Sequence, residues 1–298
     1  MKRFFLLSIF MFFLNANLFA DDRATGAQFK VEEKGDKTKS EYETTVIESK
    51  RLKDSDKVGS YNQPVWTTKR RFPTTRVYVL PENRVQIEYW LLMEGNLGGD
   101  SDPKYTGIYE IEFGLGQRLM GDFYLKTIQN GSSSPIDILS QSIELRYAFF
   151  DWGRVFGNPT VYMEWIRQSD KPQKGEVKIL LGDEINSRLF WGLNIAFERE
   201  FGSKTANEYG LSGGIAYSII DGYLSTGIEM KVAAEDEQGS RFDFLEKKFL
   251  IGPSLLYKPI PAVNLILTPL FGINMEKENG EEESKGIYAI YYILGVDL

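Results

Sequence analysis

An alternation of apolar and polar side chains recurs from Val85 to the last residue of this 298-residue chain, and it limits the possible folds to a few. In the first such segment Val85, Ile87 and Tyr89 share one side of a strand, while Gln86 and Glu88 share the other. Successive strand residues point to opposite faces, so one face suits hydrocarbon and the other suits water. This is the pattern of a strand that crosses a membrane.

The alternation divides the chain into about twelve segments, each near or above the roughly nine to eleven residues that a tilted membrane strand needs. Short connections alternate along the chain with connections that are mostly longer and polar. A soluble β-sandwich also alternates, but it has no reason to sort its loops by length. Bulges are expected at Pro253 and Pro269, because proline cannot donate to a strand ladder. The predicted strands are 84–94, 106–116, 119–129, 138–149, 159–168, 176–185, 189–200, 207–219, 223–233, 245–257, 263–275 and 286–298.

The sequence therefore predicts an all-β protein, with a closed antiparallel up-and-down transmembrane barrel over residues 84–298. A charged, mostly irregular periplasmic extension, residues 21–83, precedes it. Residues 1–20 have the pattern of a secretory signal peptide: Lys2 and Arg3, an apolar run, and Leu18-Phe19-Ala20 before two aspartates. The alternative is a membrane anchor, for which the apolar run is short. Short turns lie in the periplasm in bacterial barrels, so both ends of the barrel are expected there.

Composition removes several classes of function. The chain has no Cys and no His, so disulfides, thiolate chemistry, Ser-His-Asp hydrolysis and His-ligated metals are excluded in their usual forms. Neither an enzyme nor a cofactor is expected, and no metal site is predicted. Glu88 and Glu112 could form a general acid/base pair. No nucleophile, His or metal-ligand cluster accompanies them, so we prefer the interpretation that they pair with Lys126 and Arg146 in a water-filled interior.

The alternate positions on the polar faces predict what lines the interior of the barrel. They carry charge of both signs with an acidic excess, and several glycines, among them Gly182, Gly192 and Gly214, are expected to clear room there. The charged residues predicted to line the lumen are Glu88, Glu110, Glu112, Lys126, Glu144, Arg146, Glu164, Lys178, Glu198, Glu229 and Lys231.

Charge is distributed unevenly along the chain. Basic residues outnumber acidic ones by 14 to 11 in residues 21–84, whereas acidic residues outnumber basic ones by 31 to 19 in residues 85–298. The basic bias concentrates at Lys69, Arg70, Arg71 and Arg76. We consider two interpretations: this segment folds back into the acidic lumen as a partial plug, or it is a solvated periplasmic lead-in.

Residues 84–298 resemble the barrels of Gram-negative outer membranes. More narrowly, the segment 80–88 and the segment 109–119, Tyr-Glu-Ile-Glu-Phe-Gly-Leu-Gly-Gln-Arg-Leu, are similar to the opening hairpin of the transporter-like family named for the meta-pathway of phenol degradation. That resemblance implies a twelve-stranded channel for small, often hydrophobic, compounds. The last strand resembles a barrel-assembly signal, although Leu298 departs from the terminal Phe common in such proteins.

The expected function is passive or facilitated passage of a small solute through a narrow, acid-biased outer-membrane pore. The alternative is a non-conducting surface barrel whose extracellular loops bind a partner. The expected partners are outer-membrane lipid and lipopolysaccharide, the barrel-assembly machinery and an unidentified small solute, with no nucleic acid.

Overall fold

The computed structural model describes residues 51–99, 102–169, 171–202, 206–237, 242–278 and 281–298. The predicted signal peptide and residues 21–50 of the extension lie outside these ranges. Residues Leu52–Asp297 form one compact unit. Within the described ranges, no helix is long and apolar enough to cross a membrane.

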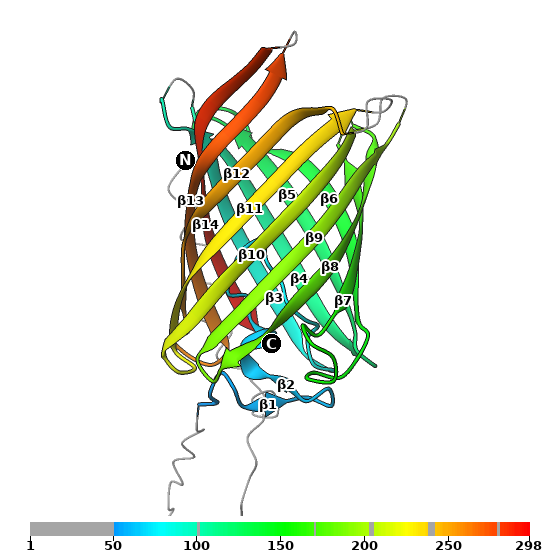
Figure 1. The fold of residues 1–298 in the computed structure, drawn as a ribbon, viewed down its shortest axis with the longest axis vertical. Coiled ribbons are helices and arrows are strands. Elements are labelled where there is room, and N and C mark those ends of the chain that lie inside the picture. The colour runs from blue at the N-terminus through cyan, green and yellow to red at the C-terminus, as the bar shows by residue number, and fades with distance from the viewer. Residues whose placement is uncertain (1–50, 100–101, 170, 203–205, 238–241, 279–280) are drawn as a thin grey trace, which may run out of the picture. The chain divides into compact units, whose positions relative to one another are not determined.

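Twelve antiparallel strands, β3 to β14, form a closed barrel in which each pairs with its neighbours in sequence and β14 pairs with β3 (Figure 1). The predicted fold class and strand count are confirmed, and most strand boundaries agree within three residues. The strands are β3 (Val85–Asn96), β4 (Lys104–Gly116), β5 (Leu119–Asn130), β6 (Asp137–Ala148), β7 (Thr160–Gln168), β8 (Gln173–Asn186), β9 (Leu189–Phe201), β10 (Ala206–Ile220), β11 (Leu224–Glu237), β12 (Phe244–Tyr257), β13 (Val263–Glu278) and β14 (Glu281–Asp297).

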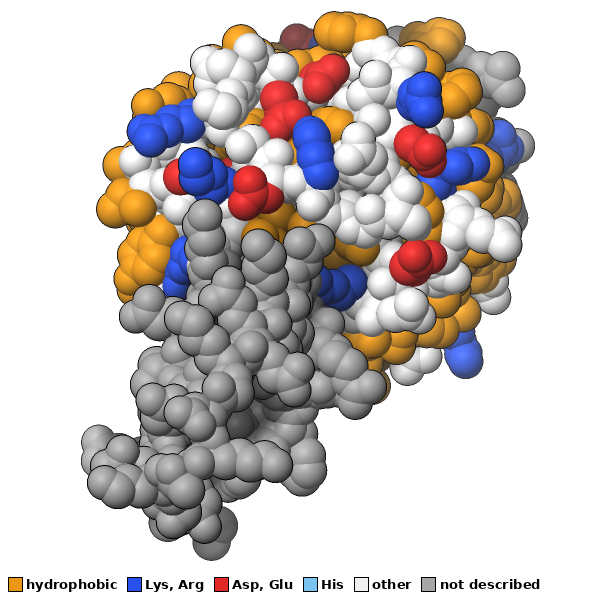
Figure 2. Space-filling model, turned by 90° about the horizontal axis from the view of Figure 1, so that it is seen from below, with side chains coloured by type: hydrophobic (Ala, Val, Ile, Leu, Met, Phe, Trp, Pro, Cys, Tyr) orange, Lys and Arg blue, Asp and Glu red, His pale blue; other side chains and the backbone are white. Residues whose placement is uncertain are grey.

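The outer surface of the barrel is apolar. Directly paired residues such as Ile143 and Trp165 point to the same side and are about half exposed, at 55% and 51%. Their neighbours along the strand, Glu144 and Glu164, are paired with each other and are buried inside. Figure 2 shows charged and polar side chains on one end face and hydrophobic side chains around its edge. An outside covered with hydrocarbon and an inside filled with charge is the arrangement that a lipid bilayer requires.

Connections at one end of the barrel are mostly tight. Residues 117–118 and 187–188 join their strands in two residues, and 221–223 in three. We call this the short-turn end, and it is the lower end in Figure 1. At the opposite end, the predicted loop 276–285 is wrong: β13 and β14 continue through it to the connection 279–280 and rise above the other strands. Lys247 and Lys285 pair with the carboxylates of this hairpin, so an acidic composition did not prevent strand pairing.

The bulges expected at the two prolines are absent from the β12–β13 ladder among the described residues. Pairing runs from Glu246 to Ile251, stops, and resumes at Leu255 in the same register. Pro253 and Pro269 both lie in this gap, so the two missing N–H donors share one interruption and the strands need no shift.

Prediction for the lipid-facing side. Ile195, at the centre of β9, is 50% exposed on the outer face, whereas Ala196 points into the lumen. Ile195→Arg should lower the free energy of unfolding by about 2–4 kcal/mol, the cost of arginine near the bilayer midplane. Ala196→Arg, the matched control, should cost much less. Urea unfolding of protein refolded into liposomes measures both, and equal costs would contradict the assigned orientation.

Candidate functional site

Residues 66–80, which we call the inserted segment, lie inside the barrel near the short-turn end. β1 (Lys57–Val58) and β2 (Gln63–Pro64) precede them at that end (Figure 1). The single turn η3 (Val65–Thr68) includes the first three residues of the segment. The segment contacts opposite walls: Arg70 bonds to β3 and β4, while Phe72 packs on β10 at Gly214. A Cβ at Gly214 would lie 2.6 Å from the Phe72 ring, and one at Gly182 would lie 2.3 Å from Val77. These glycines therefore provide the space that the segment fills.

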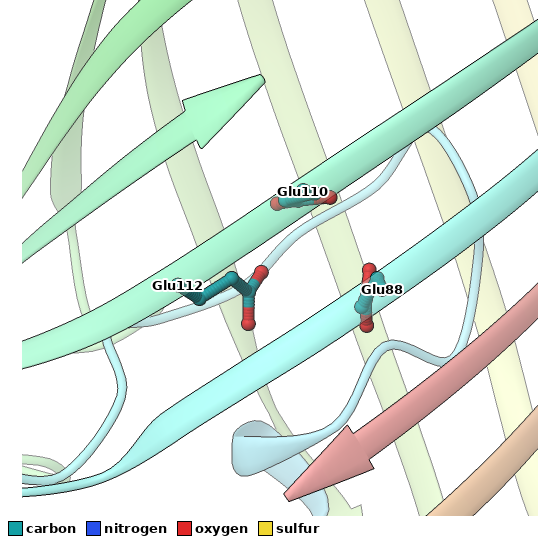
Figure 3. A group of neighbouring side chains, drawn as sticks. All are labelled: Glu88, Glu110 and Glu112. Atoms are coloured by element: carbon teal, nitrogen blue, oxygen red, sulfur yellow. The ribbon is translucent and has the colours of Figure 1, made fainter. Parts of the chain in front are cut away.

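Three buried carboxylates surround Arg70. Glu88 on β3 and Glu110 and Glu112 on β4 point toward one another beside the segment (Figure 3). The Arg70 Nε donates to Glu88 Oε2 at 2.7 Å, and Nη2 donates to Glu110 Oε1 at 2.7 Å and lies 3.4 Å from Glu112 Oε1. The guanidinium also covers the face of Trp90, 4.4 Å from the ring centroid. Buried charges are stable only when paired, and Arg70 supplies that pairing here.

Arg76 provides a second guanidinium on the same wall. Its Nη2 donates to both oxygens of Glu112, at 2.8 and 2.6 Å. Arg76 is 5% exposed and Glu112 is fully buried, so this is a charge-assisted contact in a dehydrated setting.

The acidic wall continues onto β5 and β6. Arg146 forms ion pairs with Asp122, at 3.0 Å, and with Glu144. The Tyr124 hydroxyl lies 2.7 Å from Glu110 Oε1 and 2.5 Å from Glu144 Oε2, which connects this group to the carboxylates around Arg70.

Across the lumen, Glu229 on β11 holds the middle of the segment. Its Oε1 accepts hydrogen bonds from the Thr74 amide, at 3.0 Å, and from the Thr74 and Thr75 hydroxyls, at 2.8 and 3.0 Å. Ser212 on β10 donates to the Thr74 carbonyl at 3.0 Å. The backbone of the segment is thus bonded to the wall opposite Arg70.

An aromatic core closes around the segment at the short-turn end. Trp66 stacks on Phe190 and meets Trp152 edge to face, and Tyr78 also meets Trp152. Trp152 belongs to the connection between β6 and β7, which is the longest at this end. Its amide donates a hydrogen bond to the Tyr61 carbonyl. Aromatic pairs of this kind add stability beyond the area they bury.

Asp54 anchors the residues that precede the segment. It is 1% exposed and contacts Arg71 at 2.8 Å, Lys258 at 2.9 Å and the Ser218 hydroxyl. Burial alone would raise the pKa of Asp54, but Arg71 and Lys258 outweigh it and hold that pKa below its usual range. The pKa of Lys258 is lowered to about 8 by burial and by Arg71, against the attraction of Asp54.

The remaining residues expected in the lumen lie on inward positions farther from Arg70. Lys126 and Glu164 approach each other at 3.9 Å, Lys178 covers the Tyr162 ring and pairs with Glu176, and Glu198 pairs with Lys174. Lys231 is directly opposite Ser212. Lys69 of the basic segment pairs with Asp297.

Several residues of this site were missed by the sequence analysis. Asp122 and Asp297 sit on inward positions and could have been found by the alternation, whereas Asp54 reaches the site through contacts that no pattern reports. Part of the lumen is also apolar, and we call it the apolar wall. It lies on β12 to β14 and β3 and comprises Trp90, Leu92, Leu250, Leu256, Ile266, Leu270, Ala289, Tyr291 and Ile293.

Among the described residues, only Glu88, Glu110 and Glu112 form a group whose oxygens, all within 4.8 Å of one another, could hold a metal ion. The Arg70 guanidinium already sits among these oxygens. The arrangement can therefore bind a cation, and in this structure the cation is part of the chain.

No protein-family model and no curated protein matches the sequence. Solved structures do match. An outer-membrane channel from Pseudomonas putida F1 is 13% identical with a TM-score of 0.51, over 76% of this chain and all of that one. The NanC porin (13% identity, TM-score 0.45) and the KdgM porin in complex with disordered oligogalacturonate (13%, 0.44) cover 69% and 70% of this chain and 98% and 97% of theirs.

The closed sheet, the apolar exterior and the likeness to the Pseudomonas channel together define the class. The chain has the fold of an outer-membrane β-barrel channel, and a barrel of this kind resides in the outer membrane. The narrower resemblance to the phenol-degradation family stays a prediction.

Prediction for the Asp54 anchor. Asp54→Asn leaves Arg71 and Lys258 buried without their counter-charge, and losing one partner of a buried ion pair costs about 3–5 kcal/mol. We expect trypsin to cut the variant at the sequence 69–71, which is buried in the native protein. Glu184→Gln removes the exposed contact of Glu184 with Lys57 and is the control. In this variant the peptide bonds at residues 69–71 should stay protected from trypsin. Mass spectrometry of the fragments decides; protection of residues 69–71 in both variants would contradict the anchoring role.

Prediction for pH. Because the pKa of Lys258 is about 8 in the fold against an ordinary 10.5, the unfolded chain binds more protons between these values. The free energy of unfolding should therefore rise from pH 8 to pH 9.5 through this residue. Lys258→Met should remove that part of the rise, as urea unfolding in detergent at the two pH values would show. An unchanged pH slope in the variant would count against the assignment.

Proposed function

We propose that this protein is an outer-membrane channel that passes a small solute through a narrow, acid-biased lumen, with the inserted segment as a partial plug at the periplasmic end. The observation that carries the proposal is the set of ion pairs between Arg70 or Arg76 and Glu88, Glu110 and Glu112. They hold a segment of the extension inside a barrel whose wall is acidic.

Charge supports a preference for cations. Around the segment, five buried acids on β3 to β6 face three guanidinium groups. The five are Glu88, Glu110, Glu112, Asp122 and Glu144, and the three are Arg70, Arg76 and Arg146. Fields inside a low-dielectric wall are focused, so a negative excess raises the local concentration of cations.

Chain packing supports the plug. The inserted segment is bonded to both walls of the lumen and is almost wholly buried, from Trp66 at 2% exposed to Leu80 at 1%. A twelve-stranded barrel is intermediate between small barrels filled by side chains and porins with an open channel, so one extended chain occupies much of its width.

The same packing also favours the alternative, a non-conducting barrel whose extracellular loops bind a partner. In that case the segment is a permanent part of the core. Conductance separates the two functions.

Prediction for the plug. Deleting residues 21–80 should increase single-channel conductance in planar bilayers. It should also shift the reversal potential in a KCl gradient further toward the K⁺ equilibrium potential, because Glu88, Glu110 and Glu112 lose the counter-charges of Arg70 and Arg76. Deleting 21–50, which leaves the inserted segment, is the matched control and should behave as the full chain. Equal conductance of the two deletions would rule out the plug, and a sealed barrel in both would favour the non-conducting alternative.

A further inference from the structure

The register of the barrel aligns acidic residues in a continuous row. Starting at Glu112 on β4, the residue directly opposite on the next strand is acidic at every pairing as far as β14. We call this row the carboxylate ladder. It consists of Glu112, Asp122, Glu144, Glu164, Glu176, Glu198, Glu208, Glu235, Glu246, Glu276 and Glu283.

The ladder faces the lumen along its whole length. Residues directly opposite each other in a sheet share one face, and Glu112 bonds to the inserted segment inside the barrel. Exposure increases along it: the first three members are fully buried, Glu164 is 6% exposed, and the Glu283 side chain is 65% exposed at the other end. The ladder therefore runs from the short-turn end, where the inserted segment lies, to the opposite end of the barrel.

The ladder is helical: it advances along the barrel axis as it passes from strand to strand. One full turn begins at Asp297, passes Gln86 and Glu112, and returns to β14 at Glu283, fourteen residues away (297 minus 283). At ~3.4 Å per residue this is about 47 Å along a strand. With strands tilted by about 35–45°, the turn still exceeds the about 30 Å of a hydrocarbon core.

At its inner end the ladder already holds a cation, because the guanidinium groups of Arg70 and Arg76 are seated on Glu112 and its neighbours. Two oxygens there, Glu88 Oε1 and Glu110 Oε2, receive no hydrogen bond from any described residue, although both side chains are at most 1% exposed. The site has acceptor capacity beyond what the segment uses.

Farther from the short-turn end, the ladder has space for a ligand beside its carboxylates. Lysines beside it pair with Glu176, Glu198 and Glu246. Among the described residues, no lysine or arginine nitrogen lies within 4.0 Å of Glu208 or Glu235. The adjacent row toward the short-turn end consists of small residues at this point, namely Ala196, Gly210 and Ala233.

The apolar wall distinguishes an organic cation from a metal ion. On β14 the residues Ile293, Tyr291 and Ala289 lie between Asp297 and Glu283, so hydrocarbon separates the beginning and the end of the turn. A hydrated metal ion gains nothing from such a surface, whereas a methylene chain does.

We propose that the carboxylate ladder is a binding track for linear aliphatic polyamines. Directly opposite side chains repeat about every 4.5–5.5 Å, and these molecules carry ammonium groups a few methylenes apart, a spacing close to that repeat. Each ammonium group donates charge-assisted hydrogen bonds to carboxylates, and the hydrocarbon between them meets the apolar wall. Arg70 and Arg76 occupy the carboxylates at the short-turn end of the ladder. This inference rests on the proposed function, because it names the solute class for the same lumen.

The test is isothermal titration calorimetry of the full-length protein in detergent at constant ionic strength, with spermidine as the probe and propylamine and Mg²⁺ as comparisons. Spermidine should bind at least about tenfold more tightly than either, since it forms several charge-assisted contacts at once. Glu208→Gln/Glu235→Gln should weaken spermidine binding about tenfold. Asp243→Asn/Glu282→Gln removes two carboxylates that pair with Lys277 and Lys247 off the ladder, and should change it less than twofold.

Heat-modifiable migration on a gel confirms that each variant is folded, and the comparison of ligands needs no variant. Mg²⁺ binding as tight as spermidine, or equal spermidine affinity in the two double variants, would overturn the inference. The outcome is separable from that of the conductance experiment: a sealed barrel that binds spermidine through Glu208 and Glu235 contradicts only the channel, and a conducting barrel indifferent to spermidine contradicts only the track.

Discussion

Closure of the sheet by β14 on β3 determines how the lumen and the outer surface are built. In hydrocarbon every backbone N–H and C=O must find a partner within the protein, and a closed barrel leaves no edge. Closure also fixes one register for the whole circle, and a slip by one residue would turn every side chain to the other face. Glu88 is opposite Glu110 on the inner face for this reason, and so is each member of the carboxylate ladder.

A barrel with this register has to neutralise the carboxylates it buries. The strands themselves provide Arg146 beside Asp122 and Glu144, but in the described part of the chain the ion pairs of Glu88 and Glu110 come from Arg70 alone. Arg70 and Arg76 come from the inserted segment, before the first strand of the barrel. The segment is therefore a source of counter-charge, and in the proposed plug its removal would change both the width and the electrostatics of the lumen.

Period-two alternation was sufficient to predict twelve strands, because the alternation of strand faces depends on local geometry alone. Contacts across the lumen depend on register and closure, which the alternation does not report. The charge asymmetry between residues 21–84 and the barrel suggested where Arg70 goes, but nothing in the sequence connects Asp54 with Lys258, 204 positions away. The hairpin at 276–285 was mistaken for a loop because its glutamates resemble a solvated turn, although lysines on β12 and β14 offset them.

Stability of the sheet does not account for the ladder. Like charges directly opposite each other destabilise a strand pair, and alternating glutamate with lysine at these positions would have made each pair favourable. Instead Lys178 and Lys248 lie one inward position away from Glu176 and Glu246, so each lysine offsets a carboxylate without interrupting the row. An arrangement that keeps carboxylates adjacent from strand to strand gives a migrating cation a next partner at every step. In the proposed track, a bound cation would offset this cost, as the arginines of the inserted segment do at the inner end.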